Sequence, residues 1–255
     1  MKRLDGKAAL VTGASRGVGR ATAERLAAEG AVVAVHYASA AAAAEEVVGG
    51  ILAAGGAAFA VRAEFSEPDA ADRLWAAFDE GIAEFRADPG VDILVNNAAT
   101  SVQATLADTT PEDYDRMFTV NIRTPFFLIQ QGLTRLRDGA RVINVSSAVT
   151  RMAFPQVVAY GLTKGAMDTL TLTVAQELGG RGITVNAVSP GTLDTDVNAG
   201  WLRDNPEAGR LVSEQAALGR VGQPDDVADV VVFLASDEAR WITGQVIDVS
   251  GGARL

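Results

Sequence analysis

The chain has 255 residues, a formal net charge of −10, no cysteine and one histidine. It is long enough for one α/β domain with a substantial core, and its acidic balance opposes a nucleic-acid surface, which needs clustered Lys and Arg. The composition also excludes disulfides and thiol catalysis, and it disfavours a zinc site or a Ser-His-Asp hydrolase. We expect His36, at a strand end, to be a core residue or to border a cofactor.

Short apolar runs alternate with helical stretches along the chain. The runs are rich in Val and Ile, as in parallel strands that are buried on both faces. The alternation predicts a single domain over residues 1–255 with an α/β fold, a Rossmann-like, doubly wound sheet of about seven parallel strands flanked by helices. We expect strands at 8–11, 31–36, 57–63, 91–95, 141–145, 183–188 and 245–249, and helices at 17–29, 40–54, 68–85, 111–137, 159–179 and 224–235.

A glycine-rich turn follows the first expected strand. Residues 12–19 read Thr-Gly-Ala-Ser-Arg-Gly-Val-Gly, with a helical stretch after them. Such a turn directs free backbone N–H groups and the positive end of a helix at an anion. The spacing differs from G-x-G-x-x-G, although the needs for a tight turn and for close approach to pyrophosphate are the same. The segment predicts nucleotide binding, and the alternative is an ordinary turn whose glycines adopt positive φ.

Tyr160 and Lys164 are four residues apart in an expected helix. Residues with this spacing share a helix face, so an ammonium would lie beside a phenol. A neighbouring positive charge lowers the pKa of a tyrosine from about 10, and we expect this for Tyr160. Tyr160 would then be a general acid/base that interconverts a hydroxyl and a carbonyl. Taken alone, the pair could equally be an interface tyrosine and a solvated lysine.

These motifs, with others in the same order and spacing, resemble the short-chain dehydrogenase/reductase family in its compact single-domain form, over residues 5–252. Residues 12–19 match TGxxxGxG, residues 96–99 match NNAG except at the last position, and residues 190–195 match PGxxxT. The resemblance implies an NAD(P)-dependent oxidoreductase, closest in character to 3-oxoacyl-acyl-carrier-protein reductases. The family's catalytic Asn-Ser-Tyr-Lys set falls on Asn121, Ser147, Tyr160 and Lys164.

The resemblance implies a role for each residue of this set. Ser147 would bind the substrate oxygen, and the family's thirteen-residue spacing to Tyr160 selects it over Ser146. Tyr160 would transfer the proton, while Lys164 would lower the pKa of the phenol and hold ribose hydroxyls of the cofactor. Asn121 would hold a water in a proton relay from Lys164, or it is a buried asparagine bonded to backbone.

The nature of the cofactor follows from charge. Tyr37 stands where NAD enzymes of this architecture carry a carboxylate, and Arg16 could bind a 2′-phosphate with help from Ser39. We therefore expect NADP(H) to be favoured over NAD(H), unless Arg16 is a solvated cation. The expected cofactor-binding set is Gly13, Ser15, Arg16, Gly17, Val18, Gly19, Tyr37, Ala38, Ser39, Glu64, Phe65, Asn97, Ala98, Ala99, Tyr160, Lys164, Pro190, Gly191, Leu193 and Thr195.

The substrate segment is expected at 193–218, where the family places a variable loop that acts as a lid. Trp201 in this loop, with Phe154, indicates a mostly apolar pocket for a ketone or a 3-oxoacyl-type substrate, although Trp201 could equally be core. We expect no metal. The family usually forms homotetramers, and we expect one here. Because no signal-peptide pattern or uncharged apolar stretch of 18 residues occurs, we expect a cytoplasmic protein without membrane contact.

Two alternatives stay open. The first is an NAD-dependent alcohol dehydrogenase of the same family. The second is a non-catalytic nucleotide-sensing module on the same fold, although such proteins typically lack the tyrosine or the lysine.

Overall fold

The computed structural model describes residues 2–255, in which seven parallel strands form one sheet in the order β3-β2-β1-β4-β5-β6-β7. The order reverses between β1 and β4, as in doubly wound sheets that bind ligands beyond the carboxyl ends of their strands. The predicted Rossmann-like α/β fold is confirmed. The strands are β1 (Ala8–Val11), β2 (Val32–Tyr37), β3 (Ala57–Arg62), β4 (Val91–Asn96), β5 (Leu136–Val145), β6 (Thr184–Pro190) and β7 (Val246–Val249).

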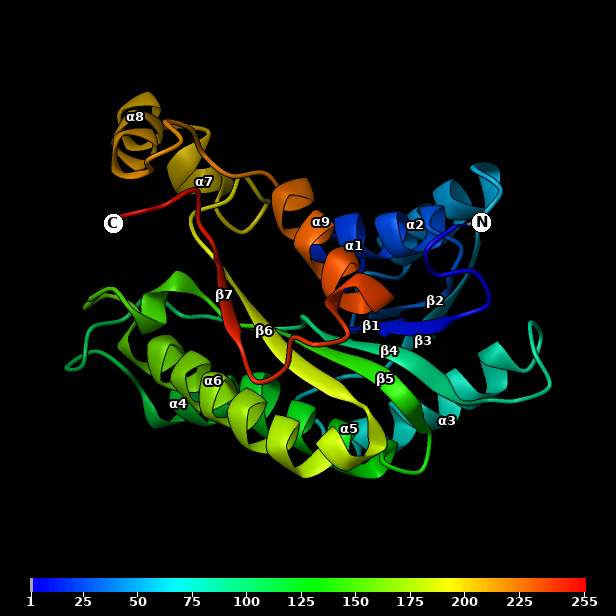
Figure 1. Cartoon of the computed structure of the whole chain (residues 1–255). Helices are drawn as coiled ribbons and strands as arrows, with labels where there is room; N and C mark the ends of the chain where they lie inside the picture. Colours follow the sequence, from blue (N-terminus) through cyan, green and yellow to red (C-terminus); the bar gives the residue numbers. More distant parts are fainter. Residues whose placement is uncertain (1) are drawn as a thin grey trace.

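Helices cover both faces of the sheet (Figure 1). One layer consists of α1 (Gly17–Ala28), α2 (Ala41–Ala53) and α9 (Pro224–Ala235). The other consists of α3 (Ala70–Ile82), α4 (Pro111–Phe118), α5 (Thr124–Gly132) and α6 (Val158–Leu178). Two buried apolar clusters follow these layers, which explains why the strands are largely apolar. Within residues 2–255, no helix combines the length and apolar character needed to cross a bilayer.

Two helices stand outside the layers. α7 (Ala199–Leu202) and α8 (Pro206–Gln215) follow β6 and lie apart from the sheet, near the C-terminus (Figure 1). The interpretation of 193–218 as a loop is therefore wrong in part. The sequence carries a signal for the start of α8. The Asn205 side chain caps the helix by accepting the N–H of Ala208 at 3.1 Å, and Pro206 is its first residue. Trp201 is 38% exposed and is not core.

The prediction of one helix over 111–137 is also wrong. A π-helical turn, Thr119–Arg123, joins α4 to α5, and α5 ends at Gly132. Gly132 packs so closely on Trp75 that an added Cβ would lie 2.7 Å from the indole ring. Leu136 then begins β5, five residues earlier than expected, because it pairs with β4 and is buried. Pairing with the sheet overrides the local helical pattern.

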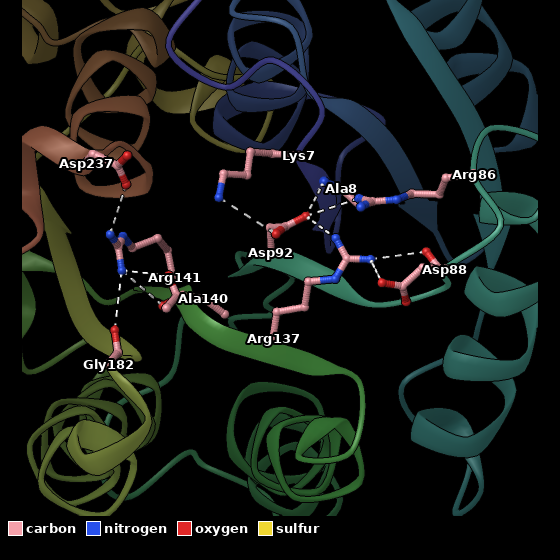
Figure 2. Close-up of polar contacts among 11 residues, drawn as sticks. Lys7, Ala8, Arg86, Asp88, Asp92, Arg137, Ala140, Arg141, Gly182 and Asp237 are labelled. Carbon is pink, nitrogen blue, oxygen red and sulfur yellow. Dashed lines mark hydrogen bonds and ion pairs between the residues drawn. The ribbon is translucent and has the colours of Figure 1, made fainter.

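A buried ion cluster ties three strands together at their amino ends (Figure 2). Asp92 of β4 is 7% exposed and accepts the N–H of Ala8, at the start of β1, at 2.8 Å. It also accepts from Arg86 and from Arg137 of β5, at 3.2 Å each, and the Lys7 ammonium lies 3.8 Å away. A buried carboxylate needs such partners to offset its lost hydration. The cluster leaves the carboxyl ends of the strands free for ligands.

Candidate active site

The turn after β1 is shaped by glycines that cannot be replaced. Gly13 has a φ of +63°, and a Cβ at Gly19 would lie 2.2 Å from the Gly13 carbonyl oxygen. α1 starts at Gly17 without a side-chain cap, so the N–H groups of its first turn have no partner within the helix. These groups and the positive helix end can bind an anion such as a pyrophosphate.

Asn97 and Thr12 hold this turn against β4. The Asn97 amide nitrogen donates to the carbonyls of Thr12 at 2.8 Å and Gly13 at 3.1 Å. In return, the Thr12 hydroxyl accepts the N–H groups of Asn97 at 2.9 Å and Ala98 at 3.0 Å. Both side-chain donors of Asn97 are therefore used within the protein, and Asn97 shapes the turn. The motif in the sequence included Thr12 but assigned no role to its side chain.

One arginine without an ion-pair partner lies at the carboxyl end of β2, and a second lies in the glycine-rich turn. Tyr37, the last residue of β2, pairs in register with Arg62, the last residue of β3. The Arg62 Nε donates to the carbonyl of Ala38 at 3.2 Å. Arg16 is exposed at the start of α1, and neither arginine forms an ion pair with any residue from 2 to 255. Sequence reasoning missed Arg62, because only strand pairing brings it beside Tyr37.

Three residues of the expected cofactor set have side chains that are engaged elsewhere. Phe65 is 3% exposed and stacks on His36 with ring centroids 4.5 Å apart. The Glu64 carboxylate accepts the N–H and the hydroxyl of Ser66 at 3.2 and 3.0 Å. Leu193 is buried in the core. These residues could contact a nucleotide through their backbone atoms, but their side chains are already engaged within the protein.

The loop after β6 meets the glycine-rich turn. An added Cβ at Gly17 would lie 3.7 Å from the Thr195 methyl group, so these two residues are neighbours. Pro190 is buried at the end of β6, and Gly191 packs on Ser250, where an added Cβ would lie 2.9 Å from the serine Cβ. Gly17 and Thr195, which are 178 residues apart in sequence, thus come together at the carboxyl ends of β1 and β6.

Ser147 and Tyr160 face each other beyond the carboxyl end of β5. Ser147 is half-buried, and its hydroxyl is near enough to the Tyr160 phenol of α6 to lower the pKa of that phenol. Ser146 is 2% exposed, and its hydroxyl has no partner in the described part of the chain. The geometry therefore supports Ser147, not Ser146, as the serine of the site.

The pKa values of Tyr160 and Lys164 are set by burial. Burial raises the pKa of Tyr160 to about 12, and the hydrogen bond with Ser147 offsets this only in part. Burial lowers the pKa of Lys164 to about 8, whereas Asp168, one turn further along α6, raises it. The Lys164 Nζ donates to the Val145 carbonyl at 2.7 Å and lies over the Tyr160 ring. The expected lowering of the Tyr160 pKa is thus wrong, because desolvation of the phenolate by burial is the largest influence on it.

Asn121 lies in the π-helical turn and is 1% exposed. Its amide oxygen accepts the N–H of Thr100 at 2.8 Å, and its nitrogen donates to the Thr100 carbonyl at 2.9 Å and the Thr163 hydroxyl at 3.0 Å. The Thr163 hydroxyl donates to the Tyr160 carbonyl at 2.7 Å. Both N–H groups of the Asn121 amide are therefore used within the protein, which fits the alternative of a buried asparagine. A relay water could bind the backbone of this turn or the second lone pair of the Asn121 amide oxygen. π-Turns are frequent at functional sites.

The chain is similar to known proteins over almost its whole length. Residues 13–254 match the family model described as enoyl-(acyl carrier protein) reductase. The chain is 41% identical to a versicolorin reductase of Emericella nidulans, over 98% of this chain and 97% of the relative. Two solved structures are similar: the promiscuous reductase LugOII, which catalyses keto-reduction at C1 in lugdunomycin biosynthesis (50% identity, TM-score 0.95, 99% of this chain and 100% of that one), and the angucycline C-6 ketoreductase LanV with bound NADP (48%, 0.94, 99% and 97%).

Proposed function

The chain belongs to the short-chain dehydrogenase/reductase family and is an oxidoreductase, and on this premise we propose that it reduces a ketone to a secondary alcohol with NADPH. The observation that carries this proposal is the grouping of Ser147, Tyr160 and Lys164 beyond β5. The turn that can bind pyrophosphate lies beyond the carboxyl end of another strand of the same parallel sheet, β1, so both lie on the same side of the sheet.

Tyr160 is the proposed proton donor. Its pKa of about 12 keeps the phenol protonated at neutral pH, so it can donate to the oxygen of a ketone whose carbon accepts a hydride. The Ser147 hydroxyl beside it can donate to the same oxygen and stabilise the charge that develops there. The Lys164 ammonium, 5.5 Å from the ring centroid, then stabilises the phenolate. NADPH, when bound, supplies the hydride.

NADP(H) fits the charges at the end of β2. A 2′-phosphate needs cations that are free to form charge-assisted bonds, and Arg16 and Arg62 meet this need. Tyr37 adds no negative charge that would repel the phosphate. The structural relative LanV carries bound NADP, which further favours this cofactor over NAD(H).

The proposed substrate is an apolar ketone. Phe154 and Trp201 keep 36% and 38% of their surface exposed, on the segments after Ser147 and after β6. The relatives are named for keto-reduction at a numbered carbon of a natural product, C1 or C-6. A ketone of this kind is therefore favoured over a 3-oxoacyl thioester, which is the second candidate.

The test follows NADPH oxidation by absorbance with two substrate panels, fused-ring aromatic ketones and 3-oxoacyl thioesters. We expect turnover with the ring ketones, and turnover lowered by about 10²–10⁴ in the Tyr160→Phe variant. Preferred turnover of the thioesters would reverse the substrate assignment. Preference for NADH would favour the NAD-dependent alcohol dehydrogenase, and NADPH binding without turnover of any ketone would favour the sensing module.

Homotetrameric assembly in the cytoplasm is proposed as well. Phe126 of α5 and Leu172 of α6 are 45% and 62% exposed, and Trp241 is 96% exposed, as apolar contacts between copies would require. Two residues that could have served this role, Leu128 and Met167, are instead buried against the rest of the chain. Light scattering at micromolar concentration should give the mass of four chains, and the mass of a monomer would refute the assembly.

A further inference from the structure

The single histidine of the chain joins three neighbouring segments at the nucleotide end of the sheet. His36 lies at the end of β2 and is 2% exposed. Its Nδ1 is 2.9 Å from the N–H nitrogen of Gly13, in the glycine-rich turn. Its Nε2 is 2.9 Å from the carbonyl oxygen of Ala63, directly after β3. The imidazole therefore bridges the segments that follow β1 and β3.

These two contacts determine the state of the ring. A backbone N–H can only donate, so Nδ1 must be an unprotonated acceptor, and a carbonyl can only accept, so Nε2 must carry the proton. Both hydrogen bonds can exist together only in the neutral ring with its proton on Nε2. Burial, which lowers the pKa of His36 to about 4, favours the same neutral form.

His36 also holds the next amide of the turn. Its backbone carbonyl accepts the N–H of Ala14 at 2.8 Å, so two consecutive N–H groups of the turn are bound by one residue. On the other side of the turn, Asn97 binds the carbonyls of Thr12 and Gly13. The Thr12–Gly13 peptide group is thus held from both sides. The N–H groups further along, at the start of α1, are left without intrahelical partners.

We propose that His36 is a positioning residue that preorganises the glycine-rich turn for the cofactor pyrophosphate by accepting the N–H of Gly13. Gly13 has a φ of +63°, a conformation that an isolated glycine adopts no more readily than several others. The hydrogen bond selects this conformation before the nucleotide arrives, so less ordering accompanies binding. Stacking on Phe65 fixes the plane of the imidazole and therefore the direction in which Nδ1 accepts. The inference rests on the proposed function, since it needs a nucleotide at this turn.

Nitrogen-15 NMR of the imidazole tests the bridge directly, and the assignment is unambiguous because the chain has one histidine. We expect an unprotonated Nδ1 and a protonated Nε2 throughout pH 5.5 to 8. A proton on Nδ1, or titration near the ordinary histidine pKa of about 6.5, would overturn the proposal.

Three variants of His36 distinguish the contributions of Nδ1, Nε2 and ring stacking. The amide of His36→Asn can take the place of Nδ1, that of His36→Gln can take the place of Nε2, and His36→Phe keeps the stacking alone. We expect the NADPH Kd, measured by fluorescence titration, to stay within about threefold of wild type for Asn and to rise about tenfold for Gln and Phe, the worth of one well-placed hydrogen bond. At saturating NADPH, kcat should change little in all three.

Val35→Ala is the matched control, because Val35 is the preceding residue of β2 and is buried on the opposite face of the sheet. It should lower Tm and leave the Kd unchanged. If the Kd of the His36 variants instead follows their Tm, or if Phe binds as tightly as wild type, His36 is only a packing residue. Failure of the wild type to bind NADPH would refute the proposed function, while the NMR result would stand.

Discussion

The ammonium of Lys164 lies 5.5 Å from the centroid of the Tyr160 ring, and its hydrogen bond goes to the Val145 carbonyl and not to the phenol. The positive charge is close enough to stabilise a phenolate but does not compensate the burial that disfavours it. The phenol of Tyr160 is therefore protonated at neutral pH, as a proposed proton donor must be. This arrangement suits reduction of a carbonyl.

Removal of the phenol hydroxyl should slow turnover strongly and preserve cofactor binding. Tyr160→Phe deletes one oxygen atom, so the fold and the NADPH Kd should be unchanged. Turnover should fall by about 10²–10⁴, the usual worth of a positioned acid/base. Steady-state kinetics and fluorescence titration measure the two quantities. A variant that keeps more than a tenth of the wild-type kcat would remove Tyr160 from the proposed mechanism.

The rate of reduction should decline as the pH rises through about 8. A lysine carries its charge below its pKa, and burial lowers the pKa of Lys164 to about 8, so the ammonium is lost above that pH. The phenol of Tyr160, with a pKa near 12, stays protonated there. The profile of kcat/KM against pH should show this single alkaline limb. Lys164→Arg keeps its charge, so a limb that persists unchanged in that variant would belong to another group.

The adjacent serines should differ sharply. The Ser147 hydroxyl faces Tyr160. The Ser146 hydroxyl is buried and forms no hydrogen bond with any residue from 2 to 255. Ser147→Ala should lower kcat by about 10² or more, the cost of losing one donor to a developing oxyanion. Ser146→Ala should leave kcat within about threefold, since no transition-state contact is lost. A larger loss of kcat in Ser146→Ala than in Ser147→Ala would show that Ser147 is not the serine of the site.

Arg16 and Arg62 should determine the choice of cofactor. Arg62→Ala and Arg16→Ala should each weaken NADPH by about tenfold, equivalent to about 1.4 kcal/mol, because each removes one charge-assisted bond. NADH, which lacks the 2′-phosphate, should bind with unchanged affinity. Arg240→Ala, which removes a charge elsewhere on the surface, is the control. Equal losses for NADPH and NADH would mean that these residues support the fold and not the phosphate.

Asp92 should matter for stability and not for activity. Asp92→Asn leaves Arg86 and Arg137 without their shared buried counter-charge, and the free energy of unfolding should fall by about 3 kcal/mol. Urea denaturation measures this change. Asp138→Asn breaks an exposed ion pair with Arg181 and should change little. A fall in kcat without a fall in stability would contradict a purely structural role for the cluster in Figure 2.

Much of the fold could be predicted because the relevant signals are local. Parallel strands buried on both faces are largely apolar, and all seven expected strands exist. Their ends shift by at most two residues, except that β5 begins five residues earlier. The glycine-rich turn was recognisable because Gly13 and Gly19 occupy positions where any Cβ would collide with backbone. The four-residue spacing of Tyr160 and Lys164 places them on one helix face wherever the helix lies.

Only the tertiary structure decided the properties that depend on distant neighbours. Leu136 belongs to a strand because it pairs with β4, although its own segment has a helical pattern. The pKa of Tyr160 rises because the protein packs around it, and helix geometry alone suggested the reverse. Arg62 comes beside Tyr37 through strand register, and His36 reaches Gly13 and Ala63 through the order of β1, β2 and β3. Sequence determines which groups a chain carries and their local spacing, whereas burial and contact across the sheet set how those groups ionise and what they bind.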